Sequence, residues 1–233
     1  MSLKGSWMMK KVKECIFLVM CFVGFAQAAD EWPAVPVPDG VQPQWVADAM
    51  VFNGVPMQIF TFDYLPGVKA LLEFYEEEWR NEGTNFKHHE SDQWEILSAP
   101  HGEHYVTIQI TDTGNSAYAQ VGVSNWGAVG DTLPELGKGL PRLPASRVIS
   151  DINAVDGGAH SRTLMIENGH SISSNFRYYL SHFSQQNWNI IQKNIGPRQT
   201  GALLSLNKEG RELELVVSRK GSKSHIVIVE VVR

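Results

Sequence analysis

The mature part of this 233-residue chain is expected to contain no cysteine. Cys15 and Cys21 both lie within the first 28 residues, which we predict to be a signal peptide. No disulfide can then form, so burial of apolar surface must stabilise an exported fold unaided. The same lack excludes a cysteine nucleophile and a thiolate metal site.

Motifs that carry catalysis or nucleotide binding are also missing. The sequence has no Gly-x-Ser-x-Gly elbow, no Walker loop, no glycine-rich dinucleotide fingerprint and no calcium loop. The segment Gly137-Lys138-Gly139 is too short to cradle a phosphate. We therefore predict a non-enzymatic protein with no catalytic residue, no metal site and no cofactor. An enzyme, with a site built from His, Asp or Glu residues of both halves, ranks third, after the two binding functions given below.

The histidines and paired carboxylates do not form a recognisable site in the sequence. His88 and His89 are adjacent, so on a strand they would point to opposite faces. His101 and His104 occupy a predicted turn and could chelate, but nothing fixes a third ligand. We expect solvated loop histidines. The three carboxylates of 76–78 fan out about 100° apart on a helix and cannot converge on one substrate atom.

The N-terminus has the pattern of a signal peptide. Lysines at positions 4, 10, 11 and 13 precede an apolar run from Cys15 to Ala26, and Ala26-Gln27-Ala28 is a small-x-small cleavage pattern. The run is shorter than the about 20 residues that a spanning helix needs. An uncleaved anchor and a lipoprotein signal at Cys21 are the alternatives, the second disfavoured by the large Met20. Met8 or Met9 would serve equally well as the start. We predict a periplasmic or secreted protein without a stable membrane anchor.

Charge is distributed unevenly in the remaining chain. Without the first 28 residues there are 16 basic and 24 acidic side chains. Residues 29–126 hold 3 basic and 15 acidic side chains, whereas 147–233 hold 11 and 7. The two halves should therefore attract each other or meet different partners. Nucleic acid is not an expected partner, because the acidic half repels phosphate and the other half has no dense basic stripe.

Periodicity predicts a repeated unit of strands and one helix. In the first copy, Asn53-Gly54 is a hairpin signal between two strands, and 68–79 has one apolar helical face that includes Tyr75. The helix is expected to begin around Pro66. Strands follow around 93–98, 105–111 and 117–124, with a short one at 85–89.

The second copy has the same order about a hundred residues later. Asp156-Gly157 is the hairpin turn, Ser171 is the helix N-cap, and Tyr179 matches Tyr75 at a distance of 104 residues. We predict an α+β fold with a tandem duplication of a ββαββββ unit, each an antiparallel sheet packed on one helix. A chance likeness of the two halves is the alternative. The predicted segments are a signal peptide (1–28), a Pro-rich lead-in (29–44), a first domain (45–126), a Pro/Gly linker (127–146) and a second domain (147–233).

One pattern resembles a known class of domains. It consists of an aromatic pair on a helix, a tryptophan after it, and alternating strands around a turn, and it comprises Phe176-Arg177-Tyr178-Tyr179, Asn187-Trp188, 202–206 and 211–215. It resembles small exported bacterial α+β domains, similar to the helix-grip domains of the lipoprotein accessory subunit of the outer-membrane barrel-assembly machinery. Asn187 stands where that pattern has glycine, and the first copy has no such tryptophan. The resemblance implies an envelope location and a non-enzymatic scaffolding role.

These patterns predict an exported two-domain protein that binds a protein partner or assists assembly in the cell envelope, through exposed sheet edges that accept a partner strand. The alternative is a periplasmic small-molecule binding protein with an apolar cavity between helix and sheet. No individual binding residue follows from the sequence.

Overall fold

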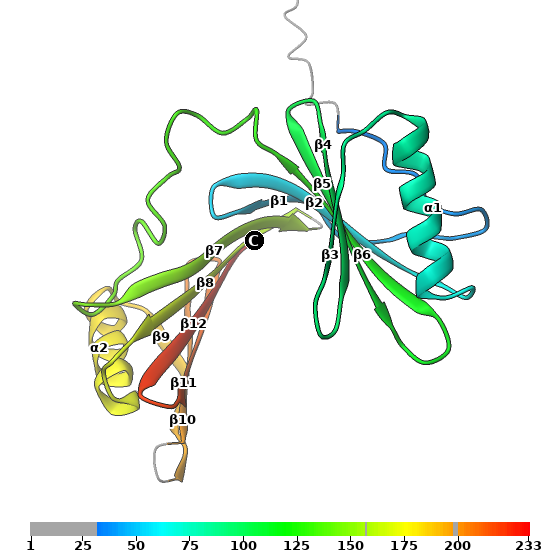
Figure 1. Ribbon diagram of the computed structural model, residues 1–233. Helices are drawn as coiled ribbons and strands as arrows, with labels where there is room; N and C mark the ends of the chain where they lie inside the picture. The colour runs from blue at the N-terminus through cyan, green and yellow to red at the C-terminus, as the bar shows by residue number, and fades with distance from the viewer. Residues whose placement is uncertain (1–31, 157, 198–199) are drawn as a thin grey trace, which may run out of the picture. The chain divides into compact units, whose positions relative to one another are not determined.

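The computed structural model describes residues 32–156, 158–197 and 200–233 (Figure 1). The elements of the first half are β1 (Gln44–Phe52), β2 (Val55–Tyr64), α1 (Val68–Asn81), β3 (Lys87–Glu90), β4 (Glu95–His101), β5 (His104–Asp112) and β6 (Ala117–Asn125). Those of the second half are β7 (Arg147–Asp156), β8 (Ala159–Asn168), α2 (Ile172–Gln185), β9 (Asn189–Ile195), β10 (Gly201–Lys208), β11 (Arg211–Lys220) and β12 (Lys223–Val232). The predicted signal peptide and Gly157 of the second hairpin turn lie outside the described residues.

The strands of the described residues form one twelve-stranded antiparallel sheet, in the order β3-β4-β5-β6-β2-β1-β7-β8-β12-β11-β10-β9. The predicted fold class, an α+β pair of units each with its own sheet on one helix, is therefore wrong. Of the residues that the structure describes, 52% lie in strands and 15% in helices, so this part of the chain is mostly antiparallel sheet. The boundaries of the two domains and of the linker stay predictions.

The physical reason for this correction is the pairing of β1 with β7. Residues Met50 to Phe52 lie opposite Ile152 to Ala154, and this short ladder joins the strands of both halves. The adjoining Asn53 N–H donates to the Asp151 carbonyl (2.9 Å), and the Asp151 N–H donates to Asn53 Oδ1 (2.8 Å). Separate sheets would leave both strands as edges with unpaired backbone groups, and the pairing satisfies those groups.

The turn beside this junction has the predicted chemistry. Asn53 and Gly54 have φ angles of 51° and 87°, as a type I′ hairpin requires. The Asp151 carboxylate is buried at the junction and accepts from Arg162 Nε (2.9 Å) and Nη2 (2.6 Å) and from the Gly137 N–H (2.8 Å). The Arg162 hydrogen bonds hold the pKa of Asp151 below its ordinary value.

Each helix buries the face that its periodicity predicts. In α1 the buried side chains are Leu71, Tyr75 and Trp79, and in α2 they include Ile172, Phe176, Tyr179 and Phe183. The Ser171 side chain accepts from the Ser174 N–H, which confirms the predicted N-cap. Pro66 is outside α1, which begins two residues later because Gly67 takes the N-cap position with a φ of 93°.

Two apolar core clusters lie between the helices and the sheet. One contains the buried face of α1 with side chains of β2, β4, β5 and β6, and the other contains that of α2 with β8, β10, β11 and β12. The strands supply alternate residues, as in β5, where Val106, Ile108 and Ile110 are buried and their neighbours are partly exposed. Burial of these faces is the main stabilising contribution in the described part of the chain, which contains no cysteine.

Tyrosine hydroxyls fix both Pro-rich segments to the helices. Tyr75 donates to the Pro36 carbonyl (2.9 Å), and Tyr178 donates to the Arg142 carbonyl (3.0 Å). In α2 the hydrogen bond thus comes from Tyr178, the neighbour of Tyr179. The buried hydroxyl of Tyr179 itself has no partner in the described part of the chain. Burial raises the pKa of both Tyr75 and Tyr179.

Candidate interaction site

The two outermost strands of the sheet differ in how they are protected. β3 is a four-residue strand of Lys87, His88, His89 and Glu90. His88 Nε2 lies 2.7 Å from a carboxylate oxygen of Glu95, and its Nδ1 lies 3.6 Å from one of Glu76 on α1. A short strand with charged side chains is how natural sheets prevent strand addition at an edge. β3 is therefore a protected edge.

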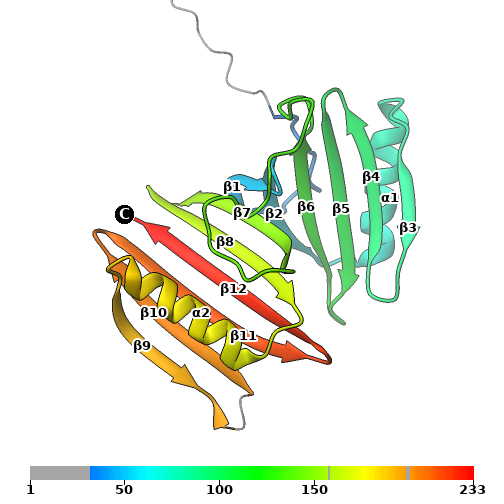
Figure 2. The same ribbon diagram turned by 90° about the vertical axis from the view of Figure 1, so that its left-hand side faces the viewer.

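β9 is the less protected edge, with one lysine and one register shift as its only devices against strand addition. It has seven residues, all exposed, and pairs on one side with β10 (Figure 2). Three of its side chains are large and apolar: Ile190, Ile191 and Ile195 are 40%, 62% and 39% exposed. Lys193 is the only charged side chain in the strand. A long edge that exposes apolar side chains and unpaired backbone groups is a template for pairing with another chain.

The register with β10 shows which β9 side chains share the face of the core. Ile190 lies opposite Leu206, Lys193 opposite Leu204 and Ile195 opposite Ala202. These β10 residues are buried in the cluster under α2, and residues directly opposite on neighbouring strands share a face. A register shift near Ile191 interrupts the alternation. The α2 face of β9 therefore presents apolar, basic and apolar side chains in turn.

The opposite face of β9 is made of amides. Asn194 lies opposite Leu203, Gln192 opposite Ser205 and Asn189 opposite Asn207. These three β10 residues are not on the face of β10 that α2 covers. The edge strand thus has one largely apolar face and one polar face, which is the alternation of a half-buried strand. One further strand beside it would cover the exposed isoleucines.

Residues before β9 fix where the edge strand starts. Asn187 follows α2 with a φ of 60°, a left-handed conformation that asparagine tolerates better than most residues. This explains how asparagine stands at a position where the resembling pattern has glycine. Trp188 is buried, donates its N–H to the Phe183 carbonyl (3.1 Å), and packs with its ring 5.5 Å from that of Phe183. The Arg211 guanidinium lies 5.1 Å from the indole centroid.

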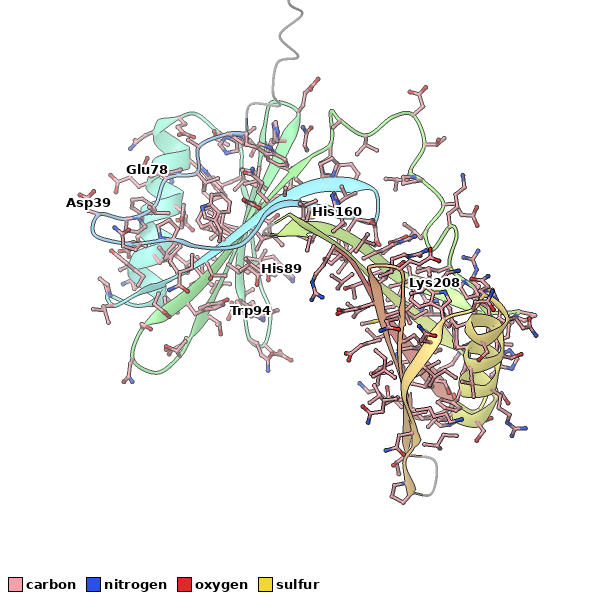
Figure 3. All side chains as sticks on the ribbon, turned by 180° about the vertical axis from the view of Figure 1, so that it is seen from behind. Asp39, Glu78, His89, Trp94, His160 and Lys208 are labelled. Atoms are coloured by element: carbon pink, nitrogen blue, oxygen red, sulfur yellow. The ribbon has the colours of Figure 1, made fainter. Side chains whose placement is uncertain are left out.

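Lysines give this end of the sheet its charge. Lys193 takes part in none of the ion pairs formed by the described residues. Lys208, labelled in Figure 3, lies at the end of β10 and donates to the Gln186 carbonyl beyond α2 (2.9 Å). Among the described residues neither lysine forms an ion pair with a carboxylate, so each contributes an unpaired positive charge here.

The histidines are placed differently from the prediction. His101 and His104 face each other across the β4–β5 turn, but both are partly buried, and each has a buried Nε2 without a partner in the described chain. Their rings pack on Trp79 (6.1 Å) and Trp32 (5.1 Å). The expectation of solvated loop histidines is wrong for this pair, because Trp79 of α1 packs on His101 and Trp32 of the lead-in packs on His104.

The other candidate residues do not form a site. His89 on β3 and His160 on β8 belong to different strands (Figure 3). Within the described ranges no group of three or more His, Cys, Asp or Glu side chains is placed to hold a metal ion. On α1, Glu76 pairs with Arg80 (2.7 Å) one turn later, and Glu77 is exposed. These carboxylates occupy separate positions along the helix surface.

An open hollow of about 660 Å³ lies beside the start of α1. Its lining includes Val68, Trp94 and Ile110 together with the carboxylates of Glu90, Asp92, Glu95 and Asp112. This hollow lies at the surface, whereas Tyr75, Trp79 and Tyr179 between helices and sheet are at most 1% exposed. The helix–sheet cores are filled at these positions.

No family model, curated protein or solved structure matches this chain. In the part of the chain that the structure describes, none of the helices has the length and apolar character that crossing a membrane requires.

Proposed function

We propose that this chain is an exported, non-enzymatic accessory protein of the cell envelope that binds a protein partner by accepting an extended segment of it beside β9. The observation that carries the proposal is an edge strand of seven exposed residues, three of them isoleucine. Strand addition forms main-chain hydrogen bonds with the partner, and the alternate side chains provide specificity.

The contrast between the two outer strands supports this role. β3 carries charges that discourage pairing, and its His88 side chain is already bonded to Glu95. β9 is protected more weakly, by one lysine and one register shift, although exposed isoleucines on an edge favour aggregation. An exposed edge of this kind is tolerated where a partner covers it in the working state.

The envelope location rests on the N-terminal pattern and on the resemblance to exported α+β domains, and both stay predictions. Cleavage after Ala28 gives a mature chain that begins at Ala29. Intact-mass measurement of the protein recovered from the envelope fraction tests this. A full-length chain found in the cytoplasm contradicts the location.

Site-specific photo-crosslinking in cells tests the binding role. A photoreactive amino acid in place of Ile191, 62% exposed on β9, should give a discrete adduct with one partner protein. The matched control is Val216, 44% exposed on β11, a strand paired on both sides. The proposal predicts an adduct at 191 and none at 216. No adduct at 191, or equal adducts at both positions, contradicts it.

Small-molecule binding stays an unconfirmed alternative prediction. It requires an apolar cavity between helix and sheet, and the buried faces of both helices are packed there. No specific observation favours it over partner binding.

A further inference from the structure

We propose that the segment accepted by β9 carries a carboxylate side chain opposite Lys193, flanked by apolar side chains on the same face. The inference rests on the proposed function and names the chemistry of its partner. It follows from the order of side chains along the edge, from the charge of the edge and from its length.

The order of side chains sets the pattern. On the α2 face of β9, Lys193 lies between Ile190 and Ile195, as their partners on β10 show. An added strand places its own side chains directly opposite these, with cross-strand Cβ atoms about 5 Å apart. Apolar side chains of the partner would cover the two isoleucines. A carboxylate between them would meet the ammonium group of Lys193.

The charge of the edge selects a carboxylate. Lys193 is exposed and joins none of the described ion pairs, and its strand contains no acidic residue. The half of the chain that contains it holds 11 basic and 7 acidic side chains. Charge complementarity contributes mainly to partner choice and register, and like charges opposite each other are disfavoured.

The same features disfavour a second copy of this chain as the occupant. Two β9 strands paired together would bring no carboxylate to Lys193, because the sequence of β9 is Asn-Ile-Ile-Gln-Lys-Asn-Ile. The β3 edge of another copy has Glu90 but no apolar side chain to cover the isoleucines. The fitting occupant is a segment of another protein with alternating apolar and acidic residues, about five to seven residues long at about 3.3 Å per residue.

Titration with synthetic peptides tests the pattern. The acidic probe is acetyl-Thr-Ile-Thr-Asp-Thr-Ile-Thr-amide, and the basic probe has lysine in place of the aspartate. With the full mature chain, the acidic probe should perturb the amide resonances of β9 and bind about five- to tenfold more tightly than the basic probe, because an ion pair is exchanged for a repulsion. Raised salt should reduce the difference.

Charge reversal on the protein provides the decisive comparison. Lys193→Glu should invert the preference, so that the basic probe binds more tightly. The control Lys87→Glu, on the protected edge β3, should leave the original preference unchanged. Equal affinity of the two probes for the wild type, an unchanged preference in Lys193→Glu, or concentration-dependent self-association through β9 overturns the inference.

The outcomes also separate this inference from the proposed function. If a partner crosslinks at position 191 but neither probe binds β9, or both bind equally, only the partner chemistry is wrong. If neither probe binds and no adduct forms at position 191, the proposed function and this inference both fail.

Discussion

Two tyrosines at equivalent places on α1 and α2 differ in what their hydroxyl groups contact. Tyr75 donates to the Pro36 carbonyl, whereas the buried Tyr179 hydroxyl has no partner within the described residues. A buried polar group without a hydrogen bond reduces stability, whereas a satisfied one contributes about 1 kcal/mol. The same substitution should therefore have different effects at the two positions.

Tyr75→Phe is expected to lower the free energy of unfolding by about 1 kcal/mol, because it removes a hydrogen bond to the lead-in. Tyr179→Phe is expected to leave it unchanged or to raise it slightly, because it removes only an unsatisfied hydroxyl. Urea denaturation of both variants beside the wild type measures the difference. Equal losses in the two variants would contradict the assigned contacts.

The Asp151–Arg162 pair should make stability depend on pH. The pKa of Asp151 is lowered in the folded state by its hydrogen bonds with Arg162, so the ionised carboxylate stabilises the fold above its ordinary pKa of 3.8. That contribution is lost as the pH falls below 3.8 and through the folded pKa. Asp151→Asn should lower the free energy of unfolding by roughly 2–3 kcal/mol at neutral pH. This loss is smaller than for a fully buried ion pair, because the Arg162 side chain is 24% exposed.

Denaturant unfolding of wild type and Asp151→Asn between pH 7 and pH 3 measures this dependence. The difference between the two proteins should be full near neutral pH and should shrink below pH 3.8. Asp48→Asn, at an exposed position on β1, is the matched control and should change little. A difference that stays constant over the whole range argues against the ion pair as its cause.

Among the elements, β9 depends on the backbone conformation of a single residue. Asn187 has a φ of 60° and turns the chain from α2 into the edge strand. Asn187→Gly should be tolerated, since glycine adopts this conformation without steric cost. Asn187→Val should destabilise the protein by about 1–2 kcal/mol, since a β-branched residue is strained there. Thermal melts of the two variants compare them directly, and equal melting temperatures would refute the strain.

Local elements could be predicted from the sequence because their causes are local. Positive φ at Asn53-Gly54, the N-cap at Ser171 and the alternation of β5 each depend on residues close in the chain. The start of α1 was missed because Gly67, and not Pro66, adopts the capping conformation. The candidate site could be predicted only as a class, an exposed edge. The segment 189–195 has the pattern of an ordinary strand, and only its place in the sheet order shows that its isoleucines are uncovered.

At the scale of the whole molecule, the predicted fold class is wrong because the sheet depends on a contact that no local sequence pattern encodes. The pairing of Met50–Phe52 with Ile152–Ala154 joins residues about a hundred positions apart. Hydrophobic periodicity identifies strands and their buried faces, but it does not determine which edge meets which. A twelve-stranded sheet and two separate sheets are therefore indistinguishable at the level of periodicity.

The two core clusters share no residue, so a destabilising substitution in one cluster should affect the strands of the sheet unequally. Phe183→Ala is expected to cost about 3–5 kcal/mol, since it removes a buried aromatic ring from the cluster under α2. Native-state hydrogen exchange should show lost protection in β10, β11 and β12 and nearly unchanged protection in β4, β5 and β6. Uniform loss across all strands would show that the sheet unfolds as one cooperative unit.

The unequal margins of the sheet determine its valency. A partner strand beside β9 would become the thirteenth of the ladder, while β3, with its charges and its His88–Glu95 bond, offers no second acceptor. The proposed strand addition would then take place at one margin of the sheet, beside β9. With one acceptor edge per chain, the proposed strand addition is expected to give an equimolar complex of the two proteins.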